Sequence, residues 1–361
     1  ATTEIYTLSL HDALPISKKP LVKQAMKYWK IPTTLPQIFM KEKNNPCMSD
    51  MKRIYISCLF LCMISAVSAQ SYDIVERRNP WNTGTNVTGI MVDSVTVSYA
   101  ELYGRNNHGD FHNYYEADKL WNAGVIAKSI SHLKNYSLIG SFSFDHTSGR
   151  NMSGSMFIHP GFYPIDILEF TPSRKDLQTY AFMGGIAKDI TPRWRIGGKI
   201  DFTSANYSKR KDLRHTNYRL ELKVAPSIMY HSDNYAIGFS YIFGKNSESV
   251  KAEEIGTATT SYYAFLDKGL MYGAYETWEG SGIHLNESGI NGFPIKELSH
   301  GVAVQFQWKS FYGDVEYSHS SGSAGEKENI WFKFPTHRII SHLSYRFTKE
   351  DAAHFLRLNL A

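Results

Sequence analysis

Residue types that bind metal ions gather in one short stretch of the chain. His108, Asp110 and His112 occupy alternate positions, and Glu116 lies nearby. Imidazole nitrogens and carboxylate oxygens are zinc ligands, and on an extended strand the two histidines would share one face. A solvated polar loop is the competing interpretation and the favoured one. We therefore expect no metal and no other cofactor, and His108, Asp110 and His112 are the candidates if a metal is bound.

A second group of side chains could bind phosphate. Lys209, Arg210, Lys211 and Arg214 lie close together in the sequence. Charge-assisted hydrogen bonds from such a cluster suit the phosphates of lipopolysaccharide. The alternative is an ordinary solvated loop.

Motifs that mark a catalytic nucleophile or a nucleotide phosphate site are absent. The sequence contains neither a G-x-S-x-G segment nor a P-loop. We assign no catalytic residue and do not expect an enzyme. A membrane-embedded hydrolase whose Asp, His and Ser residues meet only in space stays an alternative.

A secretory signal peptide begins at an internal methionine. Met51-Lys52-Arg53 gives a basic start, residues 54–67 are apolar and uncharged, and Val67-Ser68-Ala69 places small residues at a cleavage site. Cleavage after Ala69 would leave an exported chain that begins at Gln70. Residues 1–50 are then expected to be non-native: residues 1–17 resemble a translated sequencing adapter, and 18–50 read as translated leader. A natural extension with a small helix around residues 21–29 is the alternative.

Removing residues 1–69 changes the charge and the cysteine count. That segment holds nine of the 39 Lys and Arg residues, four of the 34 Asp and Glu residues, and all three cysteines. The remainder carries 30 charges of each sign, so the charge gives no reason to expect nucleic acid as a partner. Without a thiol, the exported chain can form no disulfide and no zinc–thiolate site.

Apolar and polar residues alternate with a period of two along most of the exported chain. In residues 218–230, seven positions from Tyr218 to Tyr230 fall on one face and six positions from Arg219 to Met229 on the other. A tilted membrane strand needs about 9–11 residues. The alternation predicts about eleven strands, over residues 95–103, 121–127, 136–144, 180–186, 194–202, 218–230, 235–243, 302–308, 311–317, 339–347 and 356–360.

The connections between these strands alternate in length. Short turns are predicted at 132–135, 191–193, 231–234, 309–310 and 349–352, and long loops at 104–119, 146–177, 204–217, 245–300 and 319–337. Short periplasmic turns and longer outer loops are typical of an up-and-down transmembrane β-barrel. We therefore predict an all-β, antiparallel barrel over residues 70–361, in preference to a secreted β-sandwich that binds a ligand.

In such a barrel the apolar face meets lipid and the polar face lines the lumen. A salt-bridged interior and a wet, weakly selective pore both remain possible, because both signs of charge occur. The aromatic loop 245–300 could narrow the lumen or form an outer platform for a glycan or partner. The lumen candidates are Arg195, Lys199, Asp201, Arg219, Glu221, Lys223, Asp314, Glu316, Arg338, His342 and Arg346.

Four segments carry a resemblance to a known family. They are the Asn79-Pro80-Trp81-Asn82-x-Gly84 motif and residues 153–170, 206–215 and 267–285. The chain resembles an uncharacterised family of Gram-negative outer-membrane β-barrel proteins over nearly all of 76–361. The resemblance implies a barrel and an outer-membrane address, and no substrate. We expect a role in passive transport or surface binding, with outer-membrane lipid, lipopolysaccharide and a small solute or glycan as partners.

The last predicted strand runs outward and ends near Ala361. Single-chain bacterial barrels have an even number of strands and return both ends to the periplasm. We therefore expect a chain that is truncated at its C-terminus, an open or imperfectly closed barrel, and residues 1–50 detached from it.

Overall fold

The computed structural model describes residues 2–12, 72, 79–113, 115–253, 264–267, 275–278, 285–286, 289–326, 329–349 and 352–360. The predicted signal peptide and its cleavage site lie outside these residues. Among the described residues, no helix has the length and apolar character needed to cross a bilayer.

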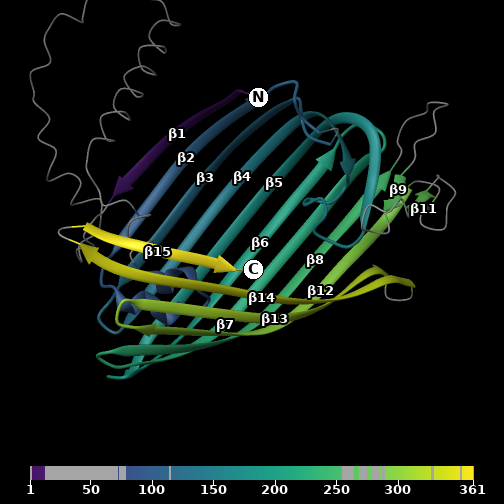
Figure 1. Ribbon diagram of the computed structural model, residues 1–361. Coiled ribbons are helices and arrows are strands. Elements are labelled where there is room, and N and C mark those ends of the chain that lie inside the picture. Colours follow the sequence, from purple (N-terminus) through teal and green to yellow (C-terminus); the bar gives the residue numbers. More distant parts are fainter. Residues whose placement is uncertain are drawn as a thin grey trace, which may run out of the picture.

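One continuous antiparallel sheet forms the molecule, and its strands follow one another in chain order (Figure 1). A single curved sheet is the predicted barrel architecture and excludes the two packed sheets of a sandwich. The strands are β1 (Thr2–Asp12), β2 (Val97–His108), β3 (Lys119–His132), β4 (Tyr136–Ser155), β5 (Asp166–Thr191), β6 (Trp194–Lys209), β7 (Arg214–His231), β8 (Tyr235–Glu253), β12 (Gly289–Trp308), β13 (Phe311–Glu326), β14 (Asn329–Lys349) and β15 (Ala352–Leu360), with β9 (Ala264–Asp267), β10 (Tyr275–Trp278) and β11 (Leu285–Asn286) between β8 and β12.

All eleven predicted strands and all five short turns are present. The predicted long loops, however, were too long, because the strands continue well past the apolar segments. Strand β5 has 26 residues, more than twice what a membrane crossing needs. Beyond the apolar band both faces of a hairpin are polar, so the alternation disappears while the backbone pairing continues.

The two faces of the sheet differ as predicted. Along β8, Ile237, Phe239 and Tyr241 are exposed, whereas Ala236 and Ser240, which alternate with them, are buried. Large exposed apolar side chains occupy the same face on the neighbouring strands. An apolar outer face and a polar inner face are the arrangement that a lipid environment requires.

The sheet is open, with β1 and β15 as its edges. This confirms the predicted open barrel. The expected detachment of residues 1–50 is wrong for Thr2–Asp12, which pairs with β2 from Thr2↔His108 to Asp12↔Ser98. An edge strand presents unpaired backbone donors and acceptors, so it accepts any extended segment that reaches it. The non-native origin of residues 1–50 stays a prediction.

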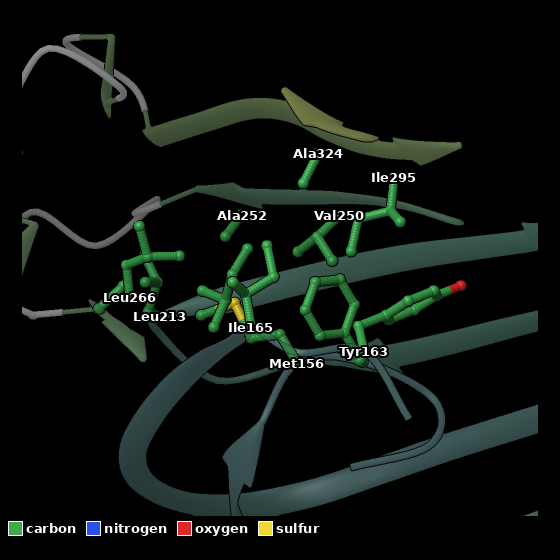
Figure 2. Packing of buried hydrophobic residues seen from close by; sticks show 12 residues of the cluster. Met156, Tyr163, Ile165, Leu213, Val250, Ala252, Leu266, Ile295 and Ala324 are labelled. Carbon is green, nitrogen blue, oxygen red and sulfur yellow. The ribbon is translucent and has the colours of Figure 1, made fainter. Parts of the chain in front are cut away.

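Apolar side chains also gather inside the curve of the sheet, at both of its ends. One cluster, drawn in Figure 2, lies where the long connections meet and includes Met156, Tyr163 and Ile165. Smaller clusters around Trp81 and Val87 lie at the end of the short turns. Both groups surround segments that are not part of the sheet, and these segments define the site.

Candidate functional site

Residues 79–92, here called the inner segment, lie against the inner face of the sheet at the short-turn end (Figure 1). They form two short 3₁₀ helices, η2 (Pro80–Thr83) and η3 (Val87–Val92). Asn79 caps η2 by accepting from the Trp81 N–H at 3.1 Å, and Asn86 caps η3 by accepting from the Thr88 N–H at 3.0 Å. Local caps satisfy backbone groups that have no strand partner, so an irregular segment can be buried here.

Trp81 anchors the inner segment to the wall. Its side chain is 1% exposed and packs with Met229, Ala236 and Tyr312. The Trp81 and Tyr312 rings meet edge to face with centroids 5.6 Å apart. The indole N–H donates to the Gln307 side-chain oxygen. Apolar burial, an aromatic pair and a satisfied polar group together fix the position of this residue.

Glycines in the wall make room for the inner segment. A Cβ added at Gly238 would lie 2.8 Å from Trp81 Cζ3, and one added at either Gly185 or Gly197 would lie 2.6 Å from a Val87 methyl carbon. Both distances are below ordinary van der Waals contact. The wall of β5, β6 and β8 is therefore shaped to the inner segment.

A chain of hydrogen bonds extends from the inner segment into the predicted lumen residues. The Asn86 N–H donates to Gln305 Oε1 at 2.6 Å, and the Gln305 amide donates to the Tyr312 hydroxyl at 2.6 Å. Tyr312 donates to Asp314 at 3.0 Å, and the other Asp314 oxygen lies 2.8 Å from His342 Nδ1. The position of the inner segment is thus coupled to side chains on three strands.

A second connection runs through Glu316. The Thr85 hydroxyl donates to Glu316 Oε2, and the Lys223 ammonium pairs with Glu316 Oε1 at 3.1 Å. Other lumen candidates pair along the wall: Arg195 with Asp189 at 2.9 Å and Arg219 with Glu221 at 3.0 Å. These contacts agree with the salt-bridged interior rather than with an empty, wet pore.

The remaining lumen candidates also lie on the inner face. Lys199 Nζ and Asp201 Oδ2 are 3.5 Å apart. Arg338 and Arg346 are exposed within the curve of the sheet. Arg346 lines a cavity of about 390 Å³ beside Asn79 and Lys309, at the mouth formed by the short turns.

Residues 156–165, here called the outer cap, fold inward at the opposite end of the sheet. Phe157 and Tyr163 are buried in the apolar cluster of Figure 2. The Ile158 N–H donates to Glu248 Oε1 at 2.9 Å, and the Asn217 amide donates to the Met156 carbonyl at 2.9 Å. These bonds fix the outer cap to β7 and β8.

The longest connection contributes to the same end. Strand β9 lies beside β5, with Ile167 opposite Leu266, and Ala264 and Leu266 are fully buried in the cluster. Part of segment 245–300 therefore packs into the apolar cluster at this end of the sheet, and its two predicted roles, narrowing the lumen and forming an outer platform, stay predictions. Tyr262, Tyr263 and Tyr272 lie outside the described residues.

A buried ionic cluster lies in the wall below the outer cap, beyond the apolar band. Lys175 Nζ is 3.1 Å from Glu169 Oε1, and Lys209 Nζ bonds to Glu169 Oε2. Burial lowers the pKa of both lysines, and the Glu169 carboxylate opposes that shift. His215 is also buried beside Tyr207, and its pKa is lowered well below the usual range by desolvation first and by the two lysines second.

Lys209 was therefore wrongly predicted to meet lipopolysaccharide. It faces inward because β6 runs on to this residue, and its side chain is fully buried. Arg210 and Lys211 are exposed in the turn that follows, and Arg214 pairs with Asp212 at 2.9 Å. The surface cluster thus shrinks to Arg210, Lys211 and a charge-paired Arg214.

The metal candidates do not share a strand. His108 ends β2, whereas Asp110 and His112 follow in the connection to β3, where His112 Nδ1 contacts the Asn113 carbonyl at 3.0 Å. Within the described ranges, no group of three or more His, Cys, Asp or Glu side chains is arranged to hold a metal ion.

A polar chamber of about 130 Å³ lies between the outer cap and the level of Glu316. Phe162 faces it from the outer cap, and charged residues face it from the wall, among them Glu221, Lys223 and Glu297. Sequence reasoning found Glu221, Lys223, Glu316 and Arg338, but it missed Lys245 and Glu297, which it placed in a loop, and the hydroxyl and glycine positions between the charged residues. Serine and glycine carry no pattern of their own in a strand.

Comparison with known proteins assigns the chain to a family. Residues 88–361 match the family of unknown function DUF6850, so the chain belongs to this family. None of the curated proteins matches it.

Solved structures of outer-membrane receptors are similar at low identity. The ferric preacinetobactin receptor BauA of Acinetobacter baumannii is 6% identical, with a TM-score of 0.39, and the match covers 73% of this chain and 42% of that one. The siderophore receptor PiuA of the same species is 8% identical, with a TM-score of 0.38 and coverages of 72% and 44%. The chain thus spans less than half the length of these receptors.

Proposed function

We propose that this protein is an exported outer-membrane barrel that binds a small polar solute between the outer cap and the inner segment. The solute passes when the inner segment leaves the wall. The observation that carries the proposal is the placement of a polar chamber between two inward-folded segments of the same chain. The proposal assigns no catalytic residue.

The outer face supports a membrane location. Trp194 and Tyr230 pair with ring centroids 5.1 Å apart beside a short turn, and Trp308 and Phe311 are exposed beside another. Rings at this height form the aromatic girdle that flanks the apolar band of outer-membrane barrels. We place the short turns in the periplasm and the outer cap outside the cell, with Arg210 and Lys211 near lipopolysaccharide phosphates.

The inner segment has the properties of a movable obstruction. It contacts the wall through side chains and caps rather than through the strand ladder, whose pairing continues behind it. Its displacement therefore breaks a limited set of contacts and leaves the sheet intact. A rigid-body movement of this kind is a common way to gate a site.

A disulfide between the inner segment and the wall tests the proposal. A Cβ added at Gly238 would lie 3.2 Å from Asn86 Cγ, a separation compatible with a bond between Asn86→Cys and Gly238→Cys. The exported chain has no other cysteine. We expect proteoliposomes with the oxidised double variant to exclude small solutes, and reduction to restore entry.

The two single variants are the matched controls, and each should admit solute regardless of redox state. Equal entry into vesicles with the oxidised and the reduced double variant would contradict the proposal.

A further inference from the structure

We infer that the chamber recognises an uncharged, polyhydroxylated ligand of monosaccharide size. This inference rests on the proposed function, because it names the class of solute that the same chamber takes. It follows from which side chains the strand register places next to one another on the inner face.

Three hydroxyl groups form a row across adjacent strands. Ser299 on β12 is directly opposite Ser320 on β13, which is directly opposite Thr336 on β14. Side chains in such cross-strand positions lie about 5 Å apart. All three line the chamber. The row therefore offers three evenly spaced groups, each able to donate and accept a hydrogen bond.

A glycine makes room for this row. Gly244 is the partner of Ser299 on one side, and a Cβ added there would collide with Ser299 Oγ. The rows on either side carry charged residues, among them Glu297 and Arg338. The result is a hollow lined by hydroxyl groups with charged groups at its rim.

Four of the six charged side chains that line the chamber already have a polar partner, and the other two, Lys245 and Arg338, are exposed. Lys223 pairs with Glu316 at 3.1 Å, Arg219 pairs with Glu221 at 3.0 Å, and the Asn246 amide donates to Glu297 at 3.4 Å. A ligand charge placed against these paired groups would have to break one of the pairs, which is costly in a partly buried site. A ligand hydroxyl can instead donate to a carboxylate or accept from an ammonium without separating the pair.

The size and the lid of the chamber agree with this class. A volume of about 130 Å³ corresponds to about four water molecules at ~30 Å³ each, so the chamber encloses part of a hexose-sized ligand and the rest of the ligand lies in the open lumen. Phe162 lies over the chamber, with the Arg219 guanidinium carbon 4.8 Å from the centre of its ring. An aromatic ring above hydroxyl groups matches a ligand with C–H groups on one face and hydroxyls at its edge.

Zwitterionic solutes are the competing class, because the chamber contains both signs of charge. Amino acids and short peptides would bind with their two charges to Arg338 and Glu297. These side chains flank β13 on opposite sides: Arg338 is paired with Ser318 and Glu297 with Gly322, four residues further along the strand. The inference predicts that this class binds more weakly than neutral polyols.

The test is equilibrium binding to the purified full chain in detergent, measured by ligand-observed NMR. The probes are D-glucose, myo-inositol and sorbitol, with glycine, lysine and a tripeptide as the zwitterionic set. We expect saturable binding of at least one neutral polyol and at least tenfold weaker binding of every zwitterion. Ser320→Leu should weaken polyol binding at least tenfold, because it fills the hollow and removes the central hydroxyl.

Ser321→Leu is the matched control, since the neighbouring residue is exposed on the opposite face of β13. It should leave binding unchanged, and heat-modifiable migration on gels should show that both variants are folded. Stronger binding of zwitterions than of polyols, no polyol binding, or equal losses in the two variants would each overturn the inference. Redox control of solute entry by the Asn86–Gly238 disulfide would persist in those cases, so failure of the ligand class is distinguishable from failure of the proposed function.

Discussion

Truncating the Trp81 side chain should release the inner segment without unfolding the sheet. Trp81 is 1% exposed and packs only within the lumen, against Met229, Ala236 and Tyr312. Replacing a buried Trp by Ala costs about 3–5 kcal/mol, including the cavity that remains. Most of that free energy is lost from docking of the inner segment, since the strand ladder does not involve Trp81. A loss of about 4 kcal/mol lowers the docked-to-undocked ratio by a factor of about a thousand.

Thiol labelling measures that ratio directly. Thr88 is a fully buried residue of the inner segment itself, and Thr88→Cys in a chain that begins at Gln70 is the sole thiol, because residues 70–361 contain no cysteine. We expect a maleimide to label this thiol about a thousandfold faster when Trp81→Ala is also present. Thr96→Cys, at an exposed position, should react equally fast in both backgrounds. Unchanged labelling at Thr88 in a folded Trp81→Ala variant would refute the account of how the inner segment is held.

Three further predictions concern the wall and the outer cap. Gly238→Val should expose the same thiol without any change at Trp81, because its two methyl groups add to a Cβ that already lies 2.8 Å from Trp81 Cζ3 and, unlike a cysteine sulfur at this position, form no bond to residue 86 that would hold the inner segment in place; normal protection would contradict this. Glu169→Gln should lower the free energy of unfolding in urea by about 3–5 kcal/mol, since it leaves two buried ammonium groups unpaired. Lys175→Met should lower it by less, and a larger loss in Lys175→Met than in Glu169→Gln would contradict the role of Glu169 as the shared partner of both lysines. Burial raises the pKa of Asp166 to about 7 from 3.8, so the unfolded carboxyl ionises first and the stability of the outer cap should fall as pH rises from about 4 to 7. Asp166→Asn should remove that fall in hydrogen exchange of residues 156–165, and an unchanged pH profile would contradict it.

The sheet could be predicted from the sequence because its pattern is local and repeated. Alternation at positions such as Tyr218 to Tyr230 predicts a strand with one apolar outer face, and short turns such as Lys309-Ser310 mark where the strands reverse. The ends of the strands could not be predicted. Above the apolar band the hairpins are polar on both faces, so residues such as Lys209 look like loop while they remain in the ladder.

The site was predicted only in part, for a related reason. Charged positions such as Lys223 and Glu316 stand out against apolar neighbours, and the period of two assigns them to the inner face. The Asn79-Pro80-Trp81 motif carried the family resemblance, yet nothing in its sequence says that it folds into the lumen. That placement depends on wall glycines such as Gly238, which are distant in sequence.

The central claim is that the inner segment obstructs the barrel, and single-channel conductance in planar bilayers tests it most directly. A chain that begins at Gln70 and a variant of it that lacks residues 79–92 should be compared under the same salt and voltage. The account predicts that the intact chain is closed for most of the recording and that the deletion variant conducts steadily. A steady, equally large conductance from both proteins, or silence from a folded and inserted deletion variant, would contradict it.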